Sequence, residues 1–112
     1  MTEIEALALS IAIEAPLAWL VAWRAGWRSR GPLHVAAASA VATAVTHPQL
    51  WAAALWAYAR FPPLPALLAL EAMVVLVEGG LIAWMARLTI RQAMLVSLIA
   101  NAGSMLFGLL LG

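Results

Sequence analysis

The sequence predicts an all-α membrane protein, a bundle of four transmembrane helices arranged as two tandem helical hairpins in a parallel repeat. Of the 112 residues, 66% are hydrophobic and only 10% are charged, and the mean hydropathy is +0.99. Soluble domains have roughly 45–50% apolar and ~25% charged residues. The charges and prolines divide the chain into four apolar stretches, and a helix needs about 20 such residues to cross a bilayer. These stretches leave no room for a soluble domain.

We expect the helices at about residues 4–23, 33–58, 66–86 and 92–111, within one domain over residues 1–112. The first stretch has no basic leader and no small-residue cleavage site, so it should remain in the mature protein. The second contains Pro48, which removes a backbone donor and kinks a helix. The third starts after the proline-rich turn, residues 61–65, and contains Gly79-Gly80 beside Glu78. The fourth follows an arginine-bearing turn and carries small polar residues at helical spacing.

Orientation follows from the arginines, because basic residues in short loops favour the cytoplasmic side. Five of the six basic residues fall in the first and third loops, and only Arg60 falls in the second. We therefore expect loops 1 and 3 in the cytoplasm and both termini outside the cell membrane. The arginines of loops 1 and 3 are Arg24, Arg28, Arg30, Arg87 and Arg91.

Two halves of the chain, residues 1–60 and 61–112, repeat one order of residues. In each half a central glutamate, Glu14 or Glu78, precedes a tryptophan and then two arginines. Small polar residues follow at matching places: Ser39, Thr43 and Thr46 in the first half, and Ser97, Asn101 and Ser104 in the second. Both hairpins would start on the outside. The sequence therefore predicts an internal repeat about an axis along the membrane normal.

A polar layer is expected at one depth in the membrane, because a helix rises about 1.5 Å per residue. Glu14 and Glu78 fall near the middle of their helices, and Glu71 shares a helix face with Glu78 but lies nearer the outside. A charge at the bilayer centre costs at least ~2.5 kcal/mol, so such residues turn inward and find partners. The remaining residues at this depth are Thr43, Thr46, His47, Asn101 and Ser104.

No Lys or Arg falls at this depth, so the glutamates must be protonated, hydrogen-bonded or neutralised by a bound cation. The eight residues form a candidate ion- or ligand-binding site. Oxygen ligands suit protons, Na⁺, Mg²⁺ or Mn²⁺, and imidazole adds Zn²⁺, Fe²⁺ or Ni²⁺, so Glu14, His47 and Glu78 are candidate metal ligands. A bound cation is the one cofactor indicated. The absence of cysteine excludes thiolate sites and disulfides.

A purely structural role is the alternative interpretation of these residues. A protonated glutamate bonded to Asn or Thr can hold helices together in lipid, contributing under ~2 kcal/mol. His47 can likewise cap the kink at Pro48 by hydrogen bonding. Neither alternative is excluded by the sequence.

Three functions follow: a cation- or proton-linked channel or transporter module, a non-catalytic subunit or assembly factor of a larger membrane complex, or an intramembrane enzyme. No catalytic residue is assigned, because no spacing defines a nucleophile–base pair. Four helices enclose little volume, so the partners expected besides the lipid bilayer are further copies of the chain or another membrane subunit. Arginines divided between turns form no basic surface, which argues against nucleic acid.

Overall fold

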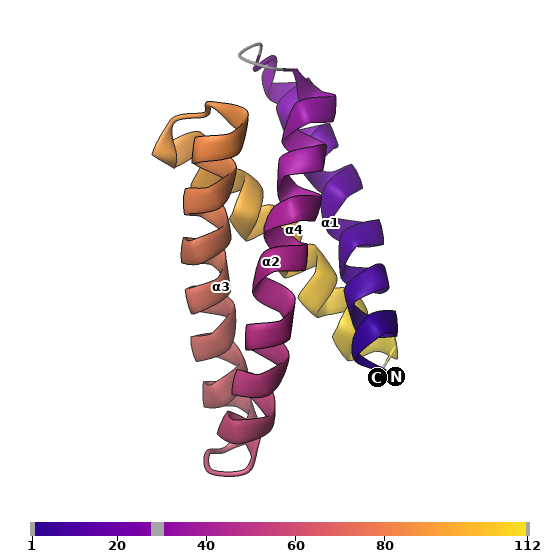
Figure 1. The fold of residues 1–112 in the computed structure, drawn as a ribbon, viewed down its shortest axis with the longest axis vertical. Coiled ribbons are helices and arrows are strands. Elements are labelled where there is room, and N and C mark those ends of the chain that lie inside the picture. Colours follow the sequence, from indigo (N-terminus) through magenta and orange to yellow (C-terminus); the bar gives the residue numbers. More distant parts are fainter. Residues whose placement is uncertain (1, 28–30, 112) are drawn as a thin grey trace.

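The computed structural model describes residues 2–27 and 31–111, and these form four helices and no strand. The helices are α1 (Glu3–Ala25), α2 (Pro32–Tyr58), α3 (Pro63–Ala86) and α4 (Ile90–Leu111). Their ends lie within three residues of those expected, and the all-α prediction is confirmed. Successive helices run in opposite directions, so both termini lie at one end of the bundle and loops 1 and 3 at the other (Figure 1).

Three helices, α1, α3 and α4, are long and apolar enough to cross a membrane, which indicates membrane association. The longest helix, α2, has 27 residues but is not among these three, because polar residues interrupt its alanine-rich sequence. A membrane position for α2 therefore stays a prediction.

Helix boundaries follow from local chemistry. At the start of α1, Thr2 and Glu5 bond reciprocally between side chain and backbone at 3.1 Å each, a capping box. Thr89 and Gln92 form the equivalent arrangement before α4, at 3.0 and 3.2 Å. Prolines occupy the first position of α2 and α3, where the missing N–H costs no helical bond. Gly26 ends α1 in the left-handed conformation with φ 71°, which glycine adopts without strain.

The helices form a ring in which α1 and α3 each contact α2 and α4. The core near loops 1 and 3 is built mainly from alanines with Val35, Ile82 and Val96. Small residues let α3 and α4 approach closely: a Cβ added to Gly79 would lie 2.6 Å from the Met94 sulfur. A second cluster joins α2 to α3 near loop 2. This packing places the middle of all four helices around one interior.

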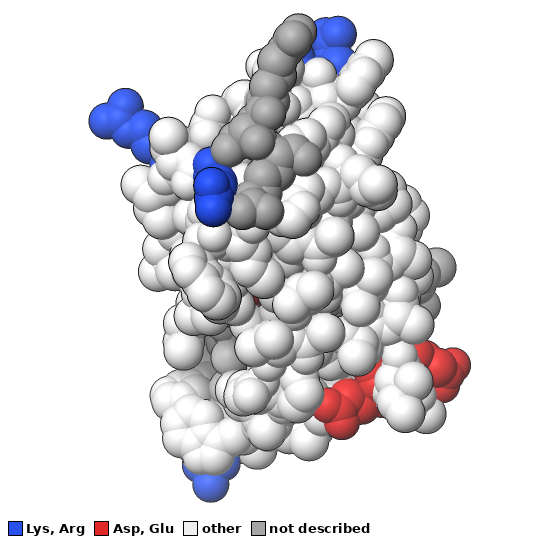
Figure 2. Space-filling model, turned by 45° about the horizontal axis from the view of Figure 1, so that its top comes forward, with Lys and Arg blue, Asp and Glu red and all other residues white. Residues whose placement is uncertain are grey.

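The surface is apolar between the two ends of the bundle. Figure 2 shows arginine side chains toward both ends, acidic side chains at one end, and a white surface between them. Arg28 and Arg30, which contribute to the predicted orientation, lie outside the described residues. Large hydrophobic side chains are exposed along this belt, whereas Glu14 and Glu78 are only 2% exposed. Apolar outside and polar inside is the arrangement expected of a protein in lipid.

Candidate functional site

A polar cavity of about 150 Å³ lies where the middles of the four helices meet, and we call it the chamber. All eight residues predicted for the site line it. Its polar lining consists of Ser10, Glu14, Thr43, Thr46, His47, Glu71, Glu78, Asn101 and Ser104. Ser10 was missed from sequence, although it lies one helical turn before Glu14 and hence on the same face of α1. Leu50 and Met105 complete the wall.

Glu14 projects from α1 and is held by groups from two other helices. The Thr43 hydroxyl on α2 donates to Glu14 Oε1 at 3.0 Å. Ser104 on α4 places its hydroxyl beside the same carboxyl group, and that hydroxyl donates to the Asn101 carbonyl oxygen at 3.3 Å. Glu14 therefore has a hydrogen-bonded partner from its own hairpin and a neighbouring hydroxyl from the other.

Glu78 projects from α3 and has the corresponding pair of partners. Asn101 Nδ2, on the neighbouring helix α4, donates to Glu78 Oε1 at 3.2 Å. Thr46 Oγ1, on α2, lies 2.6 Å from Glu78 Oε2. The Asn101 amide is positioned by Ser97, whose carbonyl accepts from Nδ2 at 2.9 Å. Two carboxyl groups thus share one cavity, each bridged to both hairpins.

The Thr46 hydroxyl lies near more hydrogen-bond acceptors than its single proton can bond to. It lies 3.0 Å from the Ala42 carbonyl oxygen as well as 2.6 Å from Glu78 Oε2. A hydroxyl has one proton to donate and two lone pairs with which to accept. It can donate to a charged Glu78, or it can donate to Ala42 while accepting the proton of a neutral Glu78. The geometry accommodates both protonation states of Glu78 without leaving the hydroxyl unpaired.

His47 and Glu71 carry ligating atoms that the described residues leave unused. The His47 side chain is only 7% exposed, yet its Nδ1 has no hydrogen-bond partner. Its ring packs against Trp51 with 6.0 Å between centroids. Helix α2 continues through Pro48, and Nδ1 makes no bond that could cap a kink there. Glu71 is half-buried and interacts with Glu78 through charge alone.

Metal coordination does not follow from this arrangement. Among residues 2–27 and 31–111, no three His, Asp or Glu side chains form a group that could hold a metal ion, so Glu14, His47 and Glu78 do not make such a centre. The lining also contains no arginine, so none of its carboxyl groups has a basic partner there.

Comparison of the chain with protein-family models, curated proteins and solved structures gives no match. The chemistry of the site therefore rests on geometry alone.

Proposed function

We propose that this protein is a small integral membrane protein that acts as a cation- or proton-linked channel or transporter module. The observation that carries the proposal is the meeting of Glu14 and Glu78, from separate hairpins, in one buried chamber whose lining has no Lys or Arg. Buried carboxylates without a counter-charge are costly. The chamber reaches neutrality by taking up protons or a cation, and uptake followed by release is the elementary step of transport.

The chamber has the parts that such a step needs. The Thr46 hydroxyl has acceptors in both protonation states of Glu78. His47 lines the same chamber, and its buried Nδ1 has no hydrogen-bond partner. A proton or a monovalent cation needs no closed set of three strong ligands, and carboxyl, hydroxyl and amide oxygens are suitable partners for it.

The internal repeat forms part of this proposal, and the contacts support it. The glutamate of each hairpin bonds to the residue at the matching place on the next helix, Thr43 for Glu14 and Asn101 for Glu78. Each glutamate also meets a hydroxyl of the other hairpin, Ser104 or Thr46. These contacts support the proposed repeat, in which a pseudo-twofold axis between the hairpins would relate the two sets.

Helix α2 is the fourth membrane span in this proposal. Its low hydropathy arises in part from residues that face inward, since Ser39, Thr43 and His47 are all buried. The arginine bias would place loops 1 and 3 in the cytoplasm and both termini outside. A chamber of about 150 Å³ holds only a few waters, at ~30 Å³ each. A continuous path across the membrane would therefore be completed by a second copy or a partner subunit.

The experiment is ion flux with purified protein reconstituted in liposomes. Wild-type protein should carry protons or Na⁺, and Glu78→Gln should reduce the flux at least about tenfold, equivalent to ~1.4 kcal/mol on the barrier. Glu5→Gln is the matched control, because Glu5 is exposed and glutamine preserves a capping box. Undiminished flux in Glu78→Gln would reject the role given to the carboxyl. A stoichiometric partner retained in mild detergent, with no flux by the chain alone, would favour the subunit function instead.

A further inference from the structure

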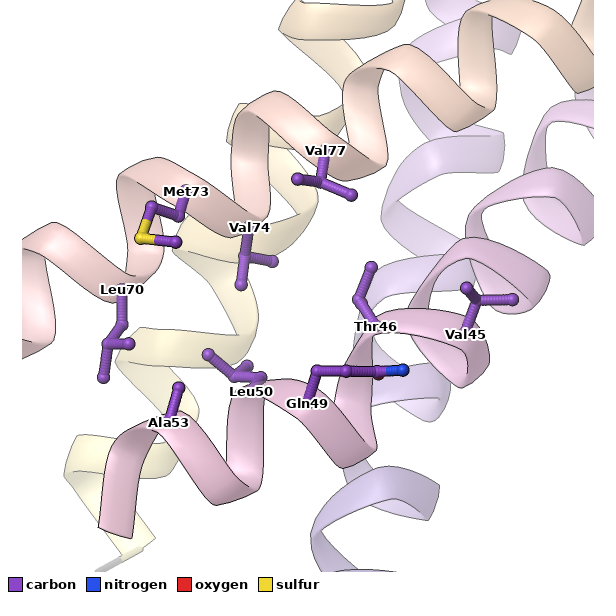
Figure 3. Close-up of a pocket in the computed structure, with 9 residues that line it drawn as sticks. All are labelled: Val45, Thr46, Gln49, Leu50, Ala53, Leu70, Met73, Val74 and Val77. Carbon is purple, nitrogen blue, oxygen red and sulfur yellow. The ribbon is translucent and has the colours of Figure 1, made fainter. Parts of the chain in front are cut away.

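An apolar groove of about 330 Å³ runs between α2 and α3 on the lipid-facing side of the bundle. Figure 3 shows its two walls, with side chains of α2 facing side chains of α3 across it. The lining residues are Val45, Thr46, Gln49, Leu50, Ala53, Leu70, Met73, Val74 and Val77. Val45, Met73 and Val77 are more than half exposed, so the groove is open at the surface. Its volume lies within the ~300–1,000 Å³ of small-molecule sites.

The groove and the chamber share two wall residues, Thr46 and Leu50. Thr46 contacts Glu78 on the chamber side, so the Thr46 and Leu50 side chains separate the groove from the buried Glu78 carboxyl group. The hydroxyl has the Ala42 carbonyl as a second acceptor at 3.0 Å. Thr46 can therefore release Glu78 to another partner without losing its own hydrogen bond.

We infer that the groove admits an amphipathic cation from the bilayer, with its apolar body between α2 and α3 and its cationic head directed past Thr46 toward Glu78. This inference rests on the proposed function and names the class of substrate. Charge complementarity favours a cationic head, because Glu14, Glu71 and Glu78 line the chamber, whereas its lining contains no Lys or Arg and His47 is its single imidazole. The apolar wall selects the body, since a bare hydrated ion gains nothing from such a surface.

Gln49 is exposed in the groove wall, at the depth of the chamber. With its amide turned so that both ends are satisfied, Nε2 donates to the Val45 carbonyl oxygen at 2.6 Å and to the Thr46 carbonyl oxygen at 3.2 Å. The Gln49 amide therefore has partners on its own helix and needs none in the groove, so the choice of occupant depends on the charge of the chamber.

A second groove, between α3 and α4, serves as the internal comparison. It has a volume of about 460 Å³ and is lined by Leu68, Glu71, Ala72, Val75, Leu76, Leu98, Ala102 and Met105. It meets the chamber through Met105 and through Glu71, whose carboxyl group lies in its wall, so it is the competing entrance for a cationic head. Leu76 and Val77 are neighbours on α3, both more than half exposed, and each lines a different groove.

The test measures binding of dodecyltrimethylammonium to the protein in phosphatidylcholine nanodiscs, with dodecyl sulfate and tetramethylammonium as the anionic and tail-free probes. Val77→Trp, which fills the groove, should weaken binding at least about tenfold, whereas Leu76→Trp should change it less than about twofold. Met73→Trp is a second groove-filling variant, for the case that Val77→Trp does not fold. Equal loss in Leu76→Trp, or dodecyl sulfate binding as tightly as the cation, would overturn the inference.

Flux measured on the same samples separates this inference from the proposed function. Proton or Na⁺ flux that depends on Glu78, with no binding of dodecyltrimethylammonium by wild-type protein, would overturn the amphipathic substrate and leave the proposed function standing. Binding that Val77→Trp abolishes, with no flux by wild-type protein, would support the groove and reject the transport function.

Discussion

The contact between Thr46 and Glu78 should be the strongest single bond of the chamber. Its 2.6 Å separation is at the short end of the ~2.5–3.0 Å range for O–H···O bonds, whereas the 3.2 Å from Asn101 to Glu78 is at the long end for N–H···O. Side-chain hydrogen bonds measured in membrane proteins average ~0.6 kcal/mol and reach ~1.7 kcal/mol. We therefore expect coupling energies of about 1.5 kcal/mol for Thr46 with Glu78 and about 0.5 kcal/mol for Asn101 with Glu78.

Two double-mutant cycles measure these energies. One combines Thr46→Val with Glu78→Leu, and the other combines Asn101→Leu with Glu78→Leu. The free energy of unfolding would be followed in bicelles by titration with dodecyl sulfate. Thr89→Ala provides the control. Thr89 caps α4 and lies about 16 Å from Glu78, counted at the rise of a helix. Its effect on the free energy of unfolding should therefore add to that of Glu78→Leu.

Which of the two coupling energies is larger tests whether the shorter hydrogen bond is the stronger one. Coupling of Thr46 with Glu78 that is no larger than the Thr89 control would refute the reasoning from distance. A larger coupling for Asn101 than for Thr46 would refute it as well, because the longer bond would then be the stronger one. Thr46→Val keeps the shape of the side chain, so packing changes at the groove contribute little to either cycle.

Three further predictions concern stability. His47→Phe should raise the free energy of unfolding by about 1–3 kcal/mol, because it removes a buried nitrogen that has no hydrogen-bond partner, and should abolish flux if His47 acts in transport. Gly80→Ala, with open space around its Cβ, should stabilise by up to about 1 kcal/mol, whereas Gly79→Ala should stabilise less, because its Cβ would displace the flexible end of the Met94 side chain; equal effects would contradict this packing. Thr89→Ala should cost about 1 kcal/mol through the lost cap of α4, measured by the same titration.

The helices could be predicted from sequence because the signals that define them are local. Length and apolarity locate a span, and prolines and arginines mark its ends, so each boundary fell within three residues of the observed one. Depth was equally accessible, since it follows from counting residues along a helix. That counting selected eight of the nine polar residues that line the chamber and missed Ser10.

Rotation of the helices about their axes could not be predicted, because nearly every face of these helices is apolar. The specific partners depend on that rotation. Nothing in the sequence indicates that Thr46 of the first hairpin contacts Glu78 of the second, or that His47 Nδ1 has no partner. The grooves beside α3 depend on the rotation of the helices and on the direction of α4 relative to α3. They could therefore be identified only from the structure.

Whether the chamber is structural or functional depends on which of its polar groups already have hydrogen-bond partners. A protonated Glu14 bonded to Thr43, and a protonated Glu78 bonded to Asn101, would suffice to hold four helices together. Such an arrangement has no use for a buried imidazole nitrogen without a partner, which costs stability wherever it occurs. The transport role that we propose accounts for this cost, because a ligand entering the chamber would give the His47 side chain a partner that the fold does not supply. A chamber that served cohesion of the bundle alone would gain nothing from it.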